Sequence, residues 1–152
     1  MYVDSQLLNE PAPDWSLENL DGREVRLSDF SNKILVLSFA RGGGNVDEEL
    51  LEFLQAQYKK YKDKGVAFVT IDYSPNPLTD DIKTNLQQWG VTIPMLTDRG
   101  AVISRYWKYS TESLIILIDE NGNIRFRNTH WHNYRPFVIE QIEYLLKSKG
   151  DR

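Results

Sequence analysis

Three glycines and an arginine follow a run of apolar residues, at a position where a loop could bind an anion. The segment reads Arg41, Gly42, Gly43, Gly44 and Asn45. Backbone N–H groups in such a loop can hold a phosphate, and Arg41 could assist them. The segment is neither Gly-x-Gly-x-x-Gly nor a P-loop, and the acids at 47–49 would oppose an anion there. We therefore treat it as a candidate ligand-binding loop, with a flexible loop that holds no ligand as the alternative.

The only two histidines, His130 and His132, lie on either side of Trp131. In an extended segment both imidazoles would face the same side, which would permit a shared metal ion. A two-histidine site would still need carboxylates from distant segments, so we predict no metal site. Surface aromatic side chains with histidine also suit a protein interface.

Cysteine is absent from the chain. Its absence excludes thiolate nucleophiles, disulfides and cysteine metal sites. The serines and histidines lie on unrelated segments, so no Ser-His-Asp triad can be proposed. We therefore predict no catalytic residue and no cofactor.

Charge and hydropathy narrow the possible partners. The formal net charge is −4 and no long basic run is present, which argues against a nucleic-acid partner. The longest apolar run, Leu114 to Ile118, is far shorter than the roughly 20 residues of a membrane-spanning helix. The N-terminus lacks the pattern of a signal peptide. We expect a soluble chain whose partner is a protein or a small molecule, with oligomeric state and compartment left open.

Two apolar runs predict strands that are buried on both faces, Ile34 to Ala40 and Val66 to Asp72. Between them an amphipathic helix is predicted, with Asn45 as its cap and Gly65 at its end. Two strands joined through a helix form a parallel pair with a right-handed crossover. The sequence therefore predicts that these two strands are adjacent and parallel.

The remaining segments complete an α/β pattern in one domain, residues 1–152, after an irregular arm at 1–14. Asn121-Gly122 is a strong hairpin signal between two apolar segments. The predicted elements are extended pieces at 15–20, 24–27 and 92–96, helices at 79–89 (capped by Thr79) and 100–107, a hairpin of 114–119 with 123–127, and a last helix that begins at Pro136. We expect a central mixed sheet flanked by helices, with an N-terminal β-hairpin.

These segments resemble the thioredoxin-like superfamily, in particular its AhpC/TSA peroxiredoxin and TlpA-type thiol-disulfide oxidoreductase branch. The resemblance lies in PAPDWSLENLDGREVRLSDFSNKILVLSFA near the start, EELLEFLQAQYKKYKDKGVAFVTID, WGVTIPMLTDRGAVISRYW, and LIILIDENGNIRFRN in the late hairpin. It covers nearly the whole chain and implies the thioredoxin-like fold.

The positions that carry the family's chemistry depart from its pattern. Gly43 and Val46 align with the two cysteines of the Cys-x-x-Cys motif, and Ser113 aligns with the family's cis-proline. The Thr-x-x-Cys motif of peroxiredoxins is also missing. The resemblance thus implies the fold and argues against the family's thiol-disulfide oxidoreductase or peroxidase activity.

In the fold that the resemblance implies, the loop after the last strand lies near the family's active site. We therefore expect His130, Trp131 and His132 to line a binding cleft together with the loop from Arg41 to Asn45. The hypothesis is a redox-inactive thioredoxin-like domain that binds a protein segment or a small ligand at this end. The alternative is a family member with non-thiol chemistry that uses His130 or His132 as an acid, a base or a metal ligand.

Overall fold

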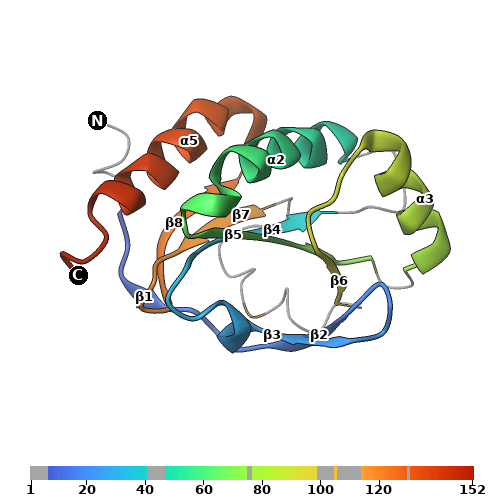
Figure 1. Cartoon of the computed structure of the whole chain (residues 1–152), viewed down its shortest axis with the longest axis horizontal. Helices are drawn as coiled ribbons and strands as arrows, with labels where there is room; N and C mark the ends of the chain where they lie inside the picture. The colour runs from blue at the N-terminus through green and yellow to red at the C-terminus, as the bar shows by residue number, and fades with distance from the viewer. Residues whose placement is uncertain (1–6, 41–46, 75–76, 99–104, 106–113, 130) are drawn as a thin grey trace.

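A computed structural model describes residues 7–40, 47–74, 77–98, 105, 114–129 and 131–152, and these residues contain one mixed sheet (Figure 1). The strands are β1 (Glu10–Pro11), β2 (Ser16–Asn19), β3 (Glu24–Arg26), β4 (Ile34–Ala40), β5 (Val66–Asp72), β6 (Met95–Thr97), β7 (Leu114–Ile118) and β8 (Asn123–Thr129). The helices are α2 (Glu48–Tyr61), α3 (Thr79–Trp89) and α5 (Trp131–Lys147), with the 3-10 turns η1 (Leu27–Phe30) and η2 (Lys62–Lys64). The order of strands across the sheet is β1-β8-β7-β4-β5-β6-β2-β3.

The two apolar strands predicted as a parallel pair lie side by side at the centre of the sheet. β4 and β5 are parallel over their full lengths, from Ile34 opposite Val66 to Ala40 opposite Asp72. On its other side β4 pairs with β7 in the antiparallel sense. The prediction of an adjacent, parallel pair is confirmed, and it follows from the short crossover through α2.

Both faces of the central strands are covered, as their uninterrupted apolar sequences predict. Ile34 and Val36 of β4 pack in one apolar cluster together with Leu50 and Leu54 of α2 and Ile142 of α5. The alternating residues of β4 pack in a second cluster, which also contains Trp15 and residues of the N-terminal hairpin. In Figure 1 the helices α2 and α5 lie above the central strands, α3 lies at the right beside β6, and the end of the sheet with β2 and β3 curls beneath the centre.

The late hairpin forms at Asn121-Gly122 as predicted, with an irregularity that the sequence does not announce. Leu117 lies opposite Phe126, but Ile118 lies opposite Ile124, so Arg125 is an extra residue in β8. A bulge of this kind reverses the alternation of the strand. It explains why Ile124 and Phe126, two residues apart, pack in different apolar clusters.

Several predicted boundaries are wrong or shifted. The last helix begins at Trp131, and Pro136 lies inside it. Thr79 is the first residue of α3 and not its cap, a position taken by Leu78 without a side-chain hydrogen bond. The extended piece at 92–96 narrows to β6. Within the N-terminal arm, Glu10 and Pro11 pair with β8.

Glycines end two of the helices as predicted. Gly65 after η2 has φ 82° and Gly90 after α3 has φ 68°, in the left-handed region that glycine adopts without strain. The proposed cap Asn45 lies outside the described residues, as does the predicted helix at 100–107 apart from Arg105. In the described part of the chain, no helix is both long and apolar enough to cross a membrane.

Candidate functional site

The residues of the predicted site fall mostly outside the part of the chain that the structure describes. The whole loop from Arg41 to Asn45 lies outside it, and so do Val46, His130 and the segment that contains Ser113. Trp131 and His132 form the first residues of α5. The predicted cleft between these segments therefore stays a prediction.

The extended conformation that we assumed around the two histidines is wrong from Trp131 onward, because the chain is already helical there. His130 lies outside the described residues, so the expectation that the two imidazoles share one side stays untested. Among the described residues, no group of three histidines, aspartates or glutamates could hold a metal ion.

The described residues do define the edge of the sheet at which the predicted loop begins. Because β4, β5 and β6 are parallel, their carboxyl ends meet at one edge. Ala40 lies opposite Asp72, and Asp72 lies opposite Thr97. The N–H of Tyr73 donates to the carbonyl of Ala40 (3.3 Å), and the N–H of Asp98 donates to the carbonyl of Asp72 (2.9 Å). The end of β4 is therefore held directly beside the ends of β5 and β6.

Three buried aspartates, which were not among the predicted site residues, lie at or next to this edge. Asp72 is fully buried, Asp98 is 3% exposed, and Asp47, just before α2, is 5% exposed. One carboxylate oxygen of Asp72 accepts the N–H of Ser74 (2.9 Å). The sequence signal for two of them is an acid at the end of VAFVTID and another directly after MLT, since residues at strand ends face the edge where α/β proteins bind ligands. Each of the three also takes part in interactions within the fold.

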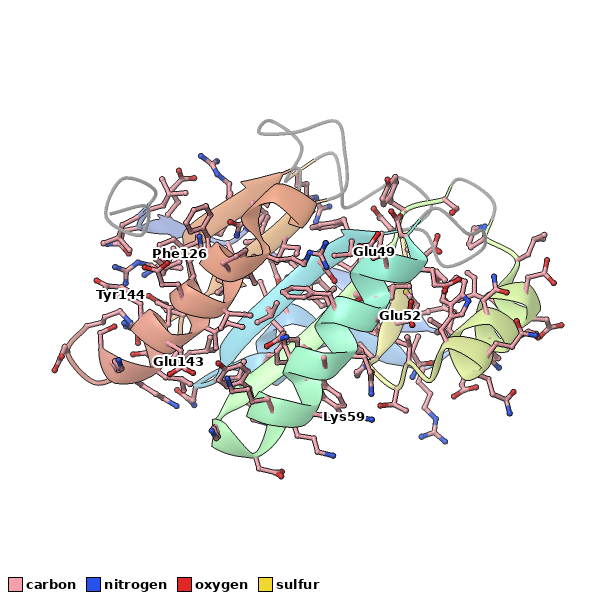
Figure 2. The ribbon with its side chains drawn as sticks, turned by 90° about the horizontal axis from the view of Figure 1, so that it is seen from above. Glu49, Glu52, Lys59, Phe126, Glu143 and Tyr144 are labelled. Atoms are coloured by element: carbon pink, nitrogen blue, oxygen red, sulfur yellow. The ribbon has the colours of Figure 1, made fainter. Side chains whose placement is uncertain are left out.

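The first turns of α2 and α5 approach each other at the same end of the molecule. Arg135 of α5 forms an ion pair with Glu49 of α2 at 3.2 Å, and both side chains are exposed. Figure 2 shows Glu49 at the start of α2. An exposed pair of this kind contributes less than about 1 kcal/mol to stability. Its use here is to show that the two helices lie close together. It brings the helix that begins with Trp131 and His132 next to the helix that follows the glycine loop.

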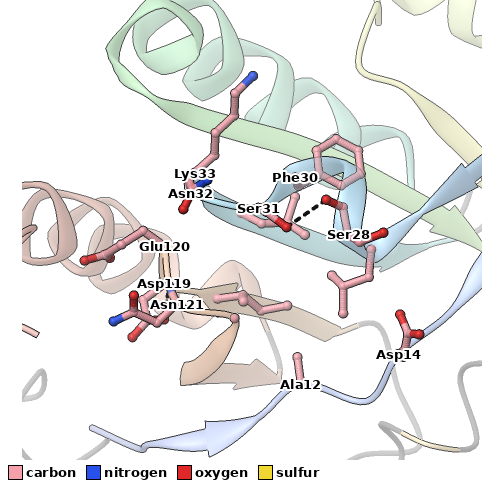
Figure 3. Close-up of a pocket in the computed structure, with 14 residues that line it drawn as sticks. Ala12, Asp14, Ser28, Phe30, Ser31, Asn32, Lys33, Asp119, Glu120 and Asn121 are labelled. Atoms are coloured by element: carbon pink, nitrogen blue, oxygen red, sulfur yellow. Dashed lines mark hydrogen bonds between the residues drawn. The ribbon is translucent and has the colours of Figure 1, made fainter.

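A pocket in the described part of the chain lies at the other end of β4 (Figure 3). It has a volume of about 520 Å³, and Leu35, Ile118 and Phe30 are among its apolar lining residues. Its charged side chains have both signs, Lys33 with Asp14 and Glu120 among them. This mixture selects no ligand class, and the pocket is not part of the predicted site.

The family model and the relatives that match this chain indicate the same family. The model of the AhpC/TSA family matches residues 8–127. The thiol-disulfide oxidoreductase ResA of Bacillus anthracis is 25% identical over 117 residues, which is 77% of this chain and 66% of ResA. The ResA of Geobacillus kaustophilus is 27% identical over 114 residues, 75% of this chain and 64% of the relative. The aligned part thus spans just under two thirds of these relatives.

Solved structures agree on the fold. A protein of Chlorobium tepidum, described as a candidate thiol:disulfide interchange protein DsbE, superposes with a TM-score of 0.79 at 22% identity, over 91% of this chain and 96% of the other. A candidate protein disulfide isomerase of Bacteroides thetaiotaomicron superposes with a TM-score of 0.78 at 26% identity, over 93% and 94%. The thioredoxin-like fold predicted from the sequence is confirmed.

Proposed function

Because this chain belongs to the AhpC/TSA family and yet contains no cysteine, we propose that it is a redox-inactive member that binds a protein segment or a small ligand. Thiol-disulfide exchange proceeds by attack of a thiolate on a disulfide sulfur, so a chain without cysteine has no group to begin it. The absence of cysteine in a chain that keeps the family's fold is the observation that carries the proposal.

The proposed binding site is the sheet edge where β4 ends and the first turns of α2 and α5 approach. The ion pair between Arg135 and Glu49 supports it, because it brings the two helices together at that edge. The acids Glu48 and Glu49 in the first turn of α2 add negative charge at this edge, which favours a ligand with cationic groups. A peptide that carries lysine or arginine fits these charges better than a phosphate does.

The first experiment tests the loss of redox chemistry. The purified protein is assayed for reduction of insulin disulfides and for consumption of hydroperoxide, with dithiothreitol as the reductant. We expect no turnover above the dithiothreitol blank. The matched control is the double variant Gly43→Cys/Val46→Cys, which restores the aligned Cys-x-x-Cys motif and should gain measurable disulfide exchange. Turnover by the wild-type protein above the blank would refute the redox-inactive function.

The second experiment tests the site. Wild-type protein, Trp131→Ala and Leu78→Ala are compared for binding to an immobilised array of random twelve-residue peptides. Leu78 is an exposed apolar residue just before α3, so Leu78→Ala is the control for loss of an apolar side chain. We expect the wild-type protein and Leu78→Ala to bind a set of peptides rich in lysine and arginine, and Trp131→Ala to lose at least about tenfold in affinity. Equal binding by all three proteins would remove Trp131 from the site.

A further inference from the structure

A concentration of lysine marks the end of the molecule that is opposite the proposed binding site. Seven exposed lysines lie in the segments that meet there: Lys33, Lys59, Lys60, Lys62, Lys64, Lys147 and Lys149. The only other lysines of the chain are Lys83 and Lys108. We call this set the lysine end.

The sheet explains why lysines so far apart in sequence meet. The N–H of Ile34 donates to the carbonyl of Gly65 (3.1 Å), which places Lys33 and Lys64 on neighbouring chains. The Nζ of Lys149 lies close to Gly65, 3.3 Å from the position that a Cβ would take there. In Figure 2, Lys59 lies at the opposite end of α2 from Glu49 and Glu52.

The positive charge at this end is only partly offset by the exposed acids Asp63 and Asp151. Within the described part of the chain, none of the seven lysines has an ion-pair partner, whereas Lys83, elsewhere, pairs with Asp21. Two carboxylates near the lysine end are already engaged. Glu143 accepts a hydrogen bond from the Tyr61 hydroxyl (2.5 Å), and Glu120 forms an ion pair with Arg152 (2.6 Å).

Aromatic rings hold part of this charge in place. The Nζ atoms of Lys60 and Lys64 lie 5.0 and 5.6 Å from the centre of the Tyr61 ring, and that of Lys62 lies 5.6 Å from the centre of the Tyr58 ring. Cation–π contacts at these distances are attractive. The ammonium groups are therefore partly ordered while they stay accessible to solvent.

The chemistry of this surface distinguishes between possible partners. Protein interfaces are enriched in aromatic residues, methionine and arginine at their cores and depleted in lysine. Among the described residues, the exposed large apolar side chains are Leu7 and Leu78, and neither belongs to the lysine end. A surface of compact ammonium groups without an apolar anchor suits a diffuse array of anionic groups. We propose that the lysine end binds the surface of a lipid bilayer that contains anionic lipids.

The overall net charge of −4 does not prevent this attraction. The 14 residues of α2 separate its first acids from its last lysines by about 20 Å, at 1.5 Å per residue. The Debye length at 0.1 M salt is about 10 Å, so a membrane at the lysine end is screened from the distant acids. Bound in this way, the protein would present the edge with Asp72 and Asp98 away from the bilayer.

The test compares two triple variants that remove the same amount of charge. Lys60→Gln/Lys62→Gln/Lys64→Gln removes three charges from the lysine end, and Arg23→Gln/Arg26→Gln/Lys83→Gln removes three exposed charges elsewhere. Co-sedimentation is measured with vesicles of phosphatidylcholine alone and of phosphatidylcholine with phosphatidylglycerol. Circular dichroism and thermal unfolding verify that both variants fold.

We expect wild-type protein and the control variant to bind only the vesicles with phosphatidylglycerol, and to be released as salt is raised. Each lysine near an anionic surface raises the binding affinity about fivefold, so the variant that lacks three lysines should bind about 100-fold more weakly. Equal binding to both kinds of vesicle, or equal weakening by the two variants, would overturn the proposal. Binding to poly-glutamate or double-stranded DNA as strong as to the vesicles, at equal anion concentration, would also overturn it and assign a polyanionic macromolecule instead.

Discussion

At the scale of single residues, Tyr61 is the group whose ionisation the fold changes most clearly. Burial, followed by the hydrogen bond to Glu143 and the negative charge of that residue, raises the pKa of Tyr61 to about 12. The ring is fully buried. A pKa raised in the folded state stabilises the protein below the unfolded pKa of about 10, and the contribution is lost as pH rises through 10 to 12.

Tyr61→Phe should therefore remove one component of alkaline unfolding. We expect the free energy of unfolding of the wild type to fall between pH 10 and 12 by about 2–3 kcal/mol more than that of Tyr61→Phe. Urea denaturation across this range measures the difference, and ultraviolet absorbance should show one tyrosine titrating near pH 12. Tyr58→Phe, at a half-buried ring in the same helix, should leave both observations unchanged. A late titration that persists in Tyr61→Phe would contradict the assignment.

A pair of buried amides joins β8 to α5. The Asn128 amide nitrogen donates to the Gln141 oxygen (2.8 Å), and the Gln141 nitrogen donates to the Asn128 oxygen (3.1 Å). Both side chains are almost completely buried. Replacing one of them by leucine removes these two hydrogen bonds while the other amide stays buried, at a cost of about 1–3 kcal/mol.

The double variant Asn128→Leu/Gln141→Leu should be less destabilised than the sum of the two single variants. We expect a coupling free energy of about 1–3 kcal/mol in a double-mutant cycle measured by urea denaturation. Additive effects would show that the two amides do not act as a pair.

The burial and pairing of these residues could not be predicted from the sequence. Asn128 and Gln141 have no local signal, because the burial of each depends on an element that packs against it from elsewhere in the chain. Asp72 and Asp98 likewise become neighbours only when β5 and β6 pair. The glycine loop and the histidines were selected from residue type and spacing, and the assumed extended conformation ends at Trp131, where α5 begins.

At the scale of elements, Pro136 provides a direct test of where the last helix begins. Proline is favourable at the first position of a helix but removes a hydrogen bond from a helix interior. In the structure it is the sixth residue of α5 and is exposed. Pro136→Ala should therefore raise the free energy of unfolding by about 1–2 kcal/mol in urea denaturation. A decrease would indicate that the helix begins at Pro136.

The hairpin of β7 and β8 is joined to the end of α5 by Arg152. This side chain forms ion pairs with Asp119 (3.5 Å) and Glu120 (2.6 Å), and it donates to the carbonyl of Leu145 (3.0 Å). Burial alone would raise the pKa of Glu120, but hydrogen bonds from Arg152 and backbone amides outweigh it and lower that pKa. A lowered pKa stabilises the fold above the unfolded value of Glu120 and is lost as the pH falls through the folded value.

Arg152→Gln should cost about 1–3 kcal/mol near neutral pH, because it leaves the largely buried Glu120 carboxylate without its cation, while Asp119 keeps Arg125. The difference from wild type should shrink as Glu120 is protonated in acid, which urea denaturation at several pH values will show. Arg26→Gln, which breaks an exposed ion pair with Glu24, should change the free energy of unfolding by less than about 0.5 kcal/mol. A loss of stability in Arg152→Gln that is independent of pH would exclude Glu120 as the responsible partner.

Elements with a strong local signal were predicted well, including both ends of β4, β5 and α3, whereas the start of α5 was not. Uninterrupted apolar runs located β4 and β5, and Asn121-Gly122 located the hairpin, since these signals are local. The bulge at Arg125 and the early start of α5 depend on packing against other elements, so no local pattern revealed them. The pairing of β2 with β6 joins residues far apart in the chain, such as Glu18 and Thr97, and could only have been proposed from the family's fold.

At the scale of the whole molecule, the lysines are distributed unevenly. Seven of the nine gather at the end opposite the carboxyl ends of the parallel strands, where Asp72 and Asp98 lie. Composition alone reports a mildly acidic protein and hides this separation. It becomes visible only once the strands are arranged, because each segment contributes a few charges.

The position of β7 beside β4 has a consequence for the unfolded chain. The sequences LIILI and ILVLSFA contain no charge and no proline, and every residue of both strands is buried in the sheet. Short segments with high β-propensity and no charge associate between chains once they are exposed. We therefore expect heating to end in aggregation, with an apparent midpoint in calorimetry that rises with scan rate. The lifetime of the protein when hot would then depend on how seldom these two strands separate, and not on an equilibrium between folded and unfolded chains.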